Sequence, residues 1–244
     1  MSQSPPVADT IPVLYGDSPS PGVITFLDVL GWKGIYTREE KPIDRMRRLI
    51  TGIKTDVALY VSNQIVVHSI SDTIILYSKD VDPTTTDITT VVDAHGKVCA
   101  NAIARSIIEN IPVRGATAVG EFSVEDDIYV GKAIDEAAIW HEKADWIGVH
   151  LTPSAVYAVE SLSPAIWKPY KPPLKEGMSI SEIPCVVWTD AWKKILPFDE
   201  IPPRKQLRTI FYNMRPITPD FAMKYANTLA FFDKICDCEK DARQ

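Results

Sequence analysis

The pattern of apolar and polar positions in the first half of the chain predicts a regular series of strands and helices. A short run rich in β-branched residues, 23–27, is typical of a buried strand. Apolar residues then recur at three- and four-residue steps over 43–57, directly after a proline, and this spacing predicts a helix of about five turns. Two more β-branched runs within 64–78 are separated by the small polar pair Ser71 and Asp72, which predicts a hairpin.

The next segments continue this series. We predict a helix over 88–110, ended by Pro112, and then a strand over 113–120. A third helix follows over 131–144, opened by a glycine, and a further strand lies at 146–152. The order strand, helix, strand, strand, helix, strand is the βαββαβ arrangement of a ferredoxin-like palm. The sequence therefore predicts an α+β fold.

Composition divides the 244 residues into a leader and one domain. Residues 1–22 are rich in Pro and Ser and are interpreted as a flexible leader, and 23–244 as a single domain. The core of this domain is expected at about 23–160, and a proline-rich excursion begins at 161. Two C-terminal elements should extend the core: a strand at 184–189 and a helix at 218–241.

Charge and hydrophobicity exclude several functional classes. With 45% hydrophobic residues the chain can build a full core, and a net charge of −6 argues against broad binding to nucleic acid or to an anionic membrane. No apolar run approaches the roughly 20 residues needed to cross a bilayer, and the first residues lack the features of a signal peptide. We therefore expect a cytoplasmic protein. Its four cysteines are too scattered for a disulfide framework or a zinc site.

Two aspartates stand at positions that otherwise look buried. Asp28 ends the first predicted strand, and Asp72 lies at the tip of the hairpin. In a palm fold these elements are neighbours, so the carboxylates would lie side by side and would need a cation between them. Two Mg²⁺ or Mn²⁺ ions can bind such carboxylates together with a nucleoside triphosphate, activate an attacking hydroxyl and neutralise the leaving pyrophosphate. The structural alternatives are a helix cap and an ordinary turn residue.

The residues on either side of Asp28 are included in the predicted site. Leu27, directly before it, joins the two aspartates in the predicted metal-binding set. The turn that follows contains Leu30, Gly31 and Trp32 and offers backbone N–H groups at a helix start, a place suited to phosphate groups.

These motifs resemble those of the class III nucleotide cyclases over roughly residues 23–154. The family's strand motif F-x-D-x-x-G matches 26–31, and its hairpin aspartate matches Asp72, although serine replaces the glycine that usually precedes it. The segment 114–120 is similar to the family's R-x-G-x-x-x-G strand, and 130–140 falls on the helix that faces the dimer partner. The resemblance implies two divalent ions per site and a homodimer with shared active sites.

The sequence also departs from the family at catalytic positions. Asp135 replaces the asparagine that steadies the ribose, and Ile139 replaces the arginine that stabilises charge in the transition state. Arg114, Lys132 or a lysine of the segment 191–194 are the candidates to supply that charge. Solvated or ion-paired side chains without a catalytic role are the alternative for Arg114 and Lys132.

Base recognition differs as well. Adenylate cyclases read adenine with a Lys and an Asp, and these positions hold His68 and Ile128. With these changes the chain resembles the pyrimidine cyclases of the bacterial Pycsar anti-phage systems, which implies conversion of UTP to cyclic UMP and a separate effector activated by the product. A cytidylate cyclase, a purine cyclase and a catalytically silent nucleotide-binding domain are the alternatives, and His68 could be an ordinary sheet histidine.

Overall fold

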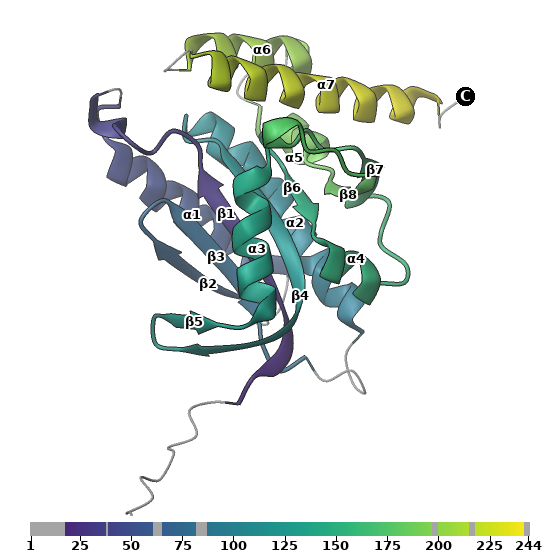
Figure 1. The fold of residues 1–244 in the computed structure, drawn as a ribbon. Coiled ribbons are helices and arrows are strands. Elements are labelled where there is room, and N and C mark those ends of the chain that lie inside the picture. The colour runs from purple at the N-terminus through teal and green to yellow at the C-terminus, as the bar shows by residue number, and fades with distance from the viewer. Residues whose placement is uncertain are drawn as a thin grey trace, which may run out of the picture.

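A sheet with helices on both faces forms the body of the molecule (Figure 1). The computed structural model describes residues 18–37, 39–60, 65–81, 87–196, 200–214 and 218–241. The core elements are β1 (Ser20–Val29), α1 (Pro42–Tyr60), β2 (Val66–Ile70), β3 (Thr73–Ser78), α2 (Ile88–Ile108) and β4 (Val113–Glu125). Their strands are antiparallel in the order β2-β3-β1-β4, which confirms the predicted βαββαβ palm.

The remaining elements extend this palm along the chain. A hairpin strand β5 (Ile128–Val130) pairs with β4, and the helix α3 (Lys132–Lys143) follows it. β6 (Val149–Leu151) runs parallel to β4 and continues the sheet toward β8 and β7. The other elements are α4 (Pro153–Ala158), β7 (Trp167–Tyr170), β8 (Ile183–Val186), α5 (Thr189–Ile195), α6 (Pro203–Asn213) and α7 (Pro219–Asp241).

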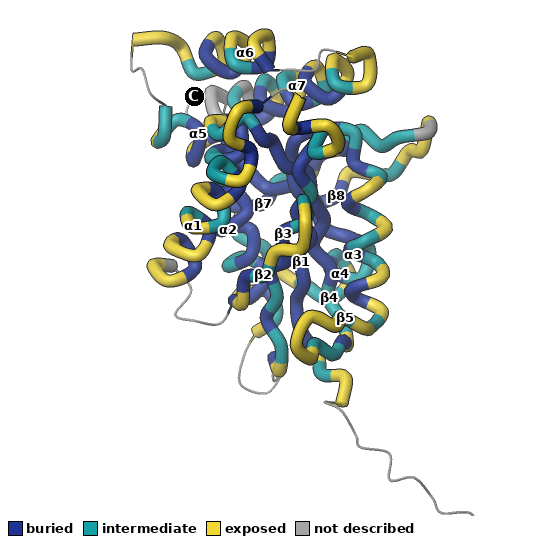
Figure 2. Tube along the Cα trace, turned by 90° about the vertical axis from the view of Figure 1, so that its left-hand side faces the viewer, coloured by how far each residue is buried: buried dark blue, intermediate teal, exposed yellow. Residues whose placement is uncertain are grey.

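Alternation along β1 decides which side chains face which helix layer. Leu27 and Val29 belong to the large core that includes side chains of α1 and α2. Phe26 belongs to the smaller core beneath α3, and Asp28 shares its face because residues two apart in a strand point the same way. Figure 2 shows the central strands as largely buried, with exposed residues on the outer turns of the helices. Asp28 therefore lies on the α3 face of the sheet.

The proline-rich excursion is more ordered than the sequence suggested. It contains β7, which pairs with β8 at the edge of the sheet. Pro169 lies opposite Pro184 in this pair, and an edge strand tolerates proline because one side of it needs no hydrogen bonds. β8 covers only the start of the strand expected at 184–189, and α5 begins at Thr189.

The first strand and the C-terminal helices differ in part from the sequence prediction. β1 starts at Ser20, inside the stretch interpreted as a leader, and residues 1–17 lie outside the described part of the chain. α7 matches the expected C-terminal helix, whereas α6 was not anticipated. These two helices lie together across one end of the sheet (Figure 1).

Two histidines are completely buried in the sheet and helix layers. His95 of α2 is hydrogen-bonded to the hydroxyls of Thr25 at 2.9 Å and Ser78 at 3.1 Å. His150 of β6 has no hydrogen-bond partner for its ring among the described residues, and its ring lies edge to face with that of Trp140 at a centroid distance of 5.9 Å. Burial lowers the pKa of His95 to about 3 and, together with His141, that of His150 to about 4.

These depressed pKa values predict that the protein loses stability in mild acid. The unfolded chain binds protons at both histidines below pH ~6.5, whereas the folded chain does not, so each should lower the free energy of unfolding by about 1.4 kcal/mol per pH unit as pH falls toward 4. We expect His150→Phe to remove one of the two contributions. Urea denaturation between pH 4.5 and 8, followed by tryptophan fluorescence, measures this; an unchanged slope in the variant would contradict a neutral buried His150.

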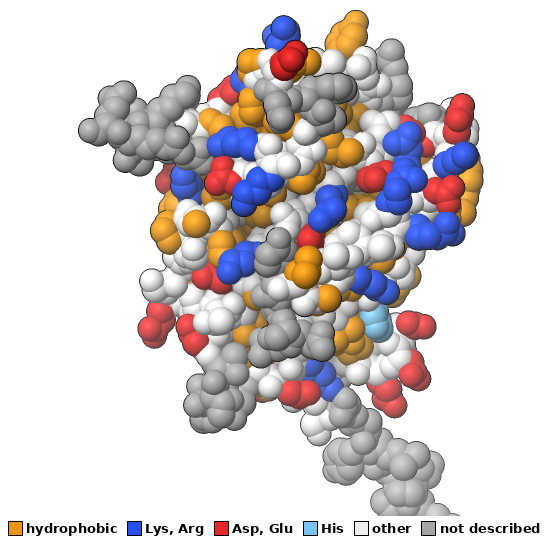
Figure 3. Space-filling view, turned by 180° about the vertical axis from the view of Figure 1, so that it is seen from behind, with side chains coloured by type: hydrophobic (Ala, Val, Ile, Leu, Met, Phe, Trp, Pro, Cys, Tyr) orange, Lys and Arg blue, Asp and Glu red, His pale blue; other side chains and the backbone are white. Residues whose placement is uncertain are grey.

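Two surface properties complete the description. No helix within the described ranges is long and apolar enough to cross a membrane. On the face opposite α3, Lys and Arg side chains are interspersed with acidic and apolar ones (Figure 3).

Candidate active site

The end of β1 and the tip of the β2–β3 hairpin meet on the α3 face of the sheet. Asp28 pairs in register with Thr73, and the N–H of Val29 donates to the carbonyl of Asp72 at 3.0 Å. The turn is tight because Ser71 adopts a left-handed φ of 57°, a conformation that glycine adopts more easily. Both predicted aspartates therefore line one polar cavity of about 520 Å³.

Arg114 is ion-paired with Asp28 inside this cavity. Its Nε donates to Asp28 Oδ2 at 3.0 Å, and Nη2 lies 3.0 Å from the same oxygen. Nη1 donates to the carbonyls of Glu142 at 2.9 Å and Ala144 at 3.0 Å. The residue is only 8% exposed. Its guanidinium is held in place by these four contacts, two to Asp28 and two to backbone carbonyls.

The titratable groups around the cavity influence one another. Burial raises the pKa of Asp28 and the Asp72 carboxylate raises it further, whereas Arg114 and His141 lower it. Burial lowers the pKa of His141, against the effect of Asp28. Burial and the nearby Arg114 also lower the pKa of Lys175. Both signs of charge thus occur within one partly buried site.

The donor atoms of the site fit a hard divalent cation. Arg114 contacts only Oδ2 of Asp28, which leaves Oδ1 without a partner among the described residues, and the Asp72 carboxylate has none there either. Leu27 is fully buried on the opposite face, so only its backbone carbonyl could be a ligand. Within the described ranges, no group of three or more His, Cys, Asp and Glu side chains is arranged to hold a metal ion by itself. The protein would thus supply carboxylate oxygens, and substrate phosphates would complete the shell, as Mg²⁺ and Mn²⁺ prefer.

The glycine turn after β1 has the open backbone that a phosphate needs. Gly31 and Gly34 adopt φ values of 76° and 75°, which side-chain-bearing residues rarely adopt. The N–H of Leu30 already donates to the carbonyl of Pro112 at 2.8 Å, so this predicted contact is used within the fold. Trp32 is half-buried and lines a separate cavity of about 450 Å³ against α1. None of the three predicted residues of this turn, Leu30, Gly31 and Trp32, is among those that line the cavity of Asp28 and Asp72.

The predicted base-reading residue His68 lies on β2, on the same face of the sheet as Asp28. Its Nδ1 is hydrogen-bonded to the hydroxyl of Tyr129, and its ring meets those of Tyr77 and Tyr129 edge to face. Burial, followed by Tyr77 and Asp127, raises the pKa of Tyr129 to about 12. Ile128, the other predicted base-reading residue, is 65% exposed.

The predicted residues of α3 lie away from the cavity. Asp135 and Lys132 are exposed near the start of α3, whereas His141 and Glu142 line the cavity near its end. With a rise of 1.5 Å per residue, Asp135 lies about 9 Å along the helix axis from His141. One chain therefore does not bring Asp135 and Lys132 together with Asp28 and Asp72.

Sequence reasoning found three of the nine residues that line the cavity and missed, among the others, His141 and Lys175. His141 stacks on Phe26, with ring centroids 5.7 Å apart, and its Nδ1 faces the carbonyl of Ala137 at 3.2 Å. Lys175 comes from the proline-rich excursion. A histidine two residues beyond the expected arginine position was the only local signal for the first, and no pattern marked the second.

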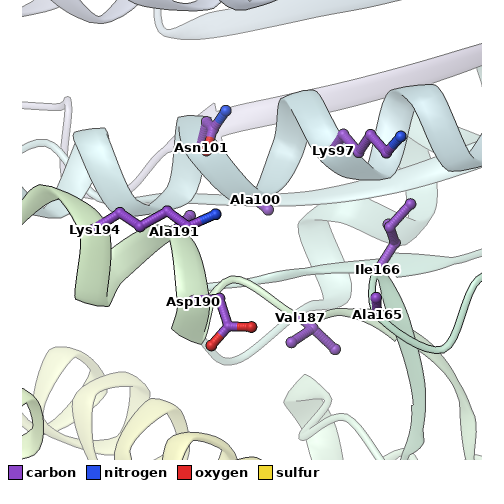
Figure 4. Close-up of a pocket in the computed structure, with 9 residues that line it drawn as sticks. All are labelled: Lys97, Ala100, Asn101, Ala165, Ile166, Val187, Asp190, Ala191 and Lys194. Atoms are coloured by element: carbon purple, nitrogen blue, oxygen red, sulfur yellow. The ribbon is translucent and has the colours of Figure 1, made fainter. Parts of the chain in front are cut away.

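The lysines of the segment 191–194 lie at a different place. Lys193 is ion-paired with Asp190 at 3.0 Å, and Lys194 lines a cavity of about 370 Å³ between α2 and α5. Figure 4 shows Lys194, Asp190 and Lys97 around this cavity, together with apolar residues such as Ile166 and Val187. Neither lysine shares the cavity of Asp28.

Comparison with known proteins identifies the fold. No protein-family model matches the sequence, and no curated protein matches it. Among solved structures, the guanylate cyclase domain of RhGC from Catenaria anguillulae in complex with GTP aligns with a TM-score of 0.52 and 11% identity, over 70% of this chain and 98% of that one. The chain has the class III nucleotide cyclase fold.

Two further cyclase structures align to a similar extent. The catalytic core of a rhodopsin-guanylyl cyclase with converted specificity, in complex with ATPαS, gives a TM-score of 0.52 at 11% identity and covers 70% of this chain and 97% of its own. The dimeric guanylyl cyclase domain of the RhoGC fusion protein from Blastocladiella emersonii gives 0.51 at 13% identity, over 70% and 98%. The cyclase fold thus accounts for most of this chain.

Proposed function

We propose that the protein is a homodimeric nucleotide cyclase that converts UTP to cyclic UMP and pyrophosphate. The observation that carries this proposal is the cavity in which Asp28 and Asp72 lie together with Arg114 and Lys175. Paired carboxylates and fixed cations are what a triphosphate and its metal ions require. As in the Pycsar systems that the sequence resembles, the product would be a second messenger for a separate effector in anti-phage defence.

In this reaction the ribose 3′-oxygen attacks the α-phosphorus, the bond from that phosphorus to pyrophosphate breaks, and the hydroxyl proton is released. Asp28 and Asp72 would hold the divalent ions, which would supply charge neutralisation and acidify the hydroxyl. Asp28 and Asp72 hold negative charge at this edge of the sheet, and Arg114 orients Asp28. Lys175 supports the proposal because its ammonium can pair with the outer phosphates in place of the missing family arginine.

The position of Asp135 and Lys132 supports a shared site between two chains. Both lie at the start of α3, too far from Asp28 of the same chain to contact a nucleotide bound there. In a two-fold dimer the same surfaces face each other, so the start of α3 from one chain can meet the carboxylates of the other. Asp135 would then steady the ribose, and Lys132 would add positive charge.

His68 supports a base that carries a carbonyl oxygen. A phenol is a stronger acid than a neutral imidazole, which favours the tautomer in which the Tyr129 hydroxyl donates and Nδ1 of His68 accepts. The other ring nitrogen, Nε2, then bears the proton and can donate to O4 of uracil. Cytosine and adenine present an amino group at the corresponding edge, and two donors facing each other cost on the order of 1–3 kcal/mol.

The same donor favours GTP as a second candidate substrate. Guanine carries a carbonyl at O6, which Nε2 of His68 could also reach. The rings of Tyr77 and Tyr129 crowd the histidine, which favours the smaller pyrimidine ring. UTP therefore remains the first candidate, ahead of GTP, CTP and ATP.

A panel of four triphosphates with Mn²⁺ tests the proposal. We expect UTP to release pyrophosphate fastest and to give cyclic UMP by mass spectrometry, and His68→Ala to reduce the preference of UTP over CTP by about tenfold through loss of one hydrogen bond. Ile70→Ala, a change on the same strand, serves as the control and should keep the preference. Fastest turnover of GTP or ATP would overturn the pyrimidine assignment, and no pyrophosphate from any of the four would favour a catalytically silent domain.

A further inference from the structure

The C-terminal helix α7 is hydrogen-bonded to the short segment that connects α3 to β6. Lys224 Nζ lies 2.8 Å from Asp145 Oδ1, and Asn227 Nδ2 donates to the Asp145 carbonyl at 2.8 Å. The N–H of Ile147 donates to the hydroxyl of Thr228 at 2.9 Å. The three α7 residues are spaced i, i+3 and i+4 and therefore share one face of the helix.

The same connecting segment holds the arginine of the active site. Ala144, directly before Asp145, accepts a hydrogen bond from Arg114 Nη1 at 3.0 Å through its carbonyl. On its other side the segment is bound to the proline-rich excursion, since the N–H of Asp145 donates to the carbonyl of Pro173 at 2.9 Å. Lys175 follows two residues later and lines the same cavity as Arg114. One short segment thus connects α7 to two cations of the site.

Two of the three α7 contact residues are buried, and Asn227 is half-buried. Lys224 is 7% exposed and Thr228 is fully buried. A buried ammonium is costly to desolvate, and an apolar side chain of similar size would often stabilise the fold as well or better. The polar groups instead determine the position of the connecting segment, because each hydrogen bond holds one particular atom of residues 145–147.

We propose that Lys224, Asn227 and Thr228 are positioning residues of the active site, which fix the Ala144 carbonyl and thereby the orientation of the Arg114 guanidinium. The role of Arg114 toward a triphosphate rests on the proposed function, whereas its orientation does not. The C-terminal helix, remote in sequence from the two aspartates, is then part of the machinery that prepares the site.

The solvent exchange rate of the Arg114 Nε proton, measured by ¹⁵N NMR, tests the proposal without nucleotide. Arg114→Lys assigns the signal by its disappearance. We expect exchange to become about tenfold faster in Asn227→Ala and in Lys224→Met, because each variant loses its hydrogen bond to Asp145. Lys224→Arg should restore the slow rate, because it keeps a cation next to Asp145.

Lys234→Met is the matched control. Lys234 is another α7 lysine in an ion pair, with Glu182 at 3.0 Å, and it contacts no residue of the connecting segment. We expect wild-type exchange in this variant. Equal exchange rates in the wild type, Asn227→Ala and Lys224→Met would overturn the proposal, as would an equal acceleration by Lys234→Met, which would indicate general loosening of α7.

Pyrophosphate binding adds a readout of function. We expect Asn227→Ala to weaken binding of inorganic pyrophosphate about tenfold, in parallel with the faster exchange. If the wild type binds no pyrophosphate, the proposed function fails while the proton exchange still decides the positioning. If exchange accelerates and pyrophosphate affinity stays at the wild-type value, the contact orients Arg114 without serving the site, and the proposal is wrong.

Discussion

Replacement of Asp72 by alanine is expected to lower metal-dependent pyrophosphate release about a thousandfold or more, because it removes one of the two carboxylates that we propose as ligands of the ions. The Asp72 side chain has no protein partner among the described residues, so its loss should leave thermal unfolding almost unchanged. Initial rates with Mn²⁺, together with the melting temperature, measure both effects. Rates near that of the wild type would exclude a site built on the two carboxylates.

Asp28 calls for a different substitution. Asp28→Ala would leave the buried Arg114 without its counter-charge, which costs on the order of 3–5 kcal/mol when a buried pair is broken. Asp28→Asn keeps an acceptor for Arg114 and removes the charge, so it separates the catalytic effect from the structural one.

Mixing two inactive variants should restore activity if the site is shared between chains. Asp72→Ala removes the metal side of a site, and Asp135→Ala removes the ribose side. In a two-fold dimer formed from one chain of each kind, one of the two sites receives both intact halves. After random pairing, roughly half of the dimers are mixed, so we expect recovery of about a quarter of the wild-type rate.

The design includes its own control. Asp72→Ala mixed with Asp28→Asn carries both defects on the same half-site, so no mixed dimer gains activity from the exchange. Sedimentation of each mixture verifies that dimers form. Full activity of wild-type monomers at high dilution, or no recovery in the first mixture despite dimer formation, would contradict a shared site.

Local patterns were sufficient to predict the palm and the two aspartates. β1, the β2–β3 hairpin and α1 each carry a strong periodic signal, and their order defines the sheet. Asp28 and Asp72 could be found because a carboxylate beside an apolar run is conspicuous. The seven-residue helix α5 spans too few turns to show a comparable pattern.

The other groups of the site depend on contacts between distant segments. The pairing of Asp28 with Arg114 follows from the register of β1 against β4, which no local pattern specifies. His141 reaches the cavity only because α3 crosses β1 and β4 at a particular angle, and Lys175 only because its loop is bound to the α3–β6 connection. Prolines concealed β7, since they normally argue against a strand.

The facing prolines of β7 and β8 have a consequence for self-association. Neither Pro169 nor Pro184 has an N–H, so this pair occupies a position without hydrogen bonds between the two strands. The nitrogen of Pro169 then points outward, and the free border of the sheet lacks a donor in the middle of a four-residue strand. An incoming chain cannot extend the sheet there by strand addition, so this border is protected against fibril-like growth.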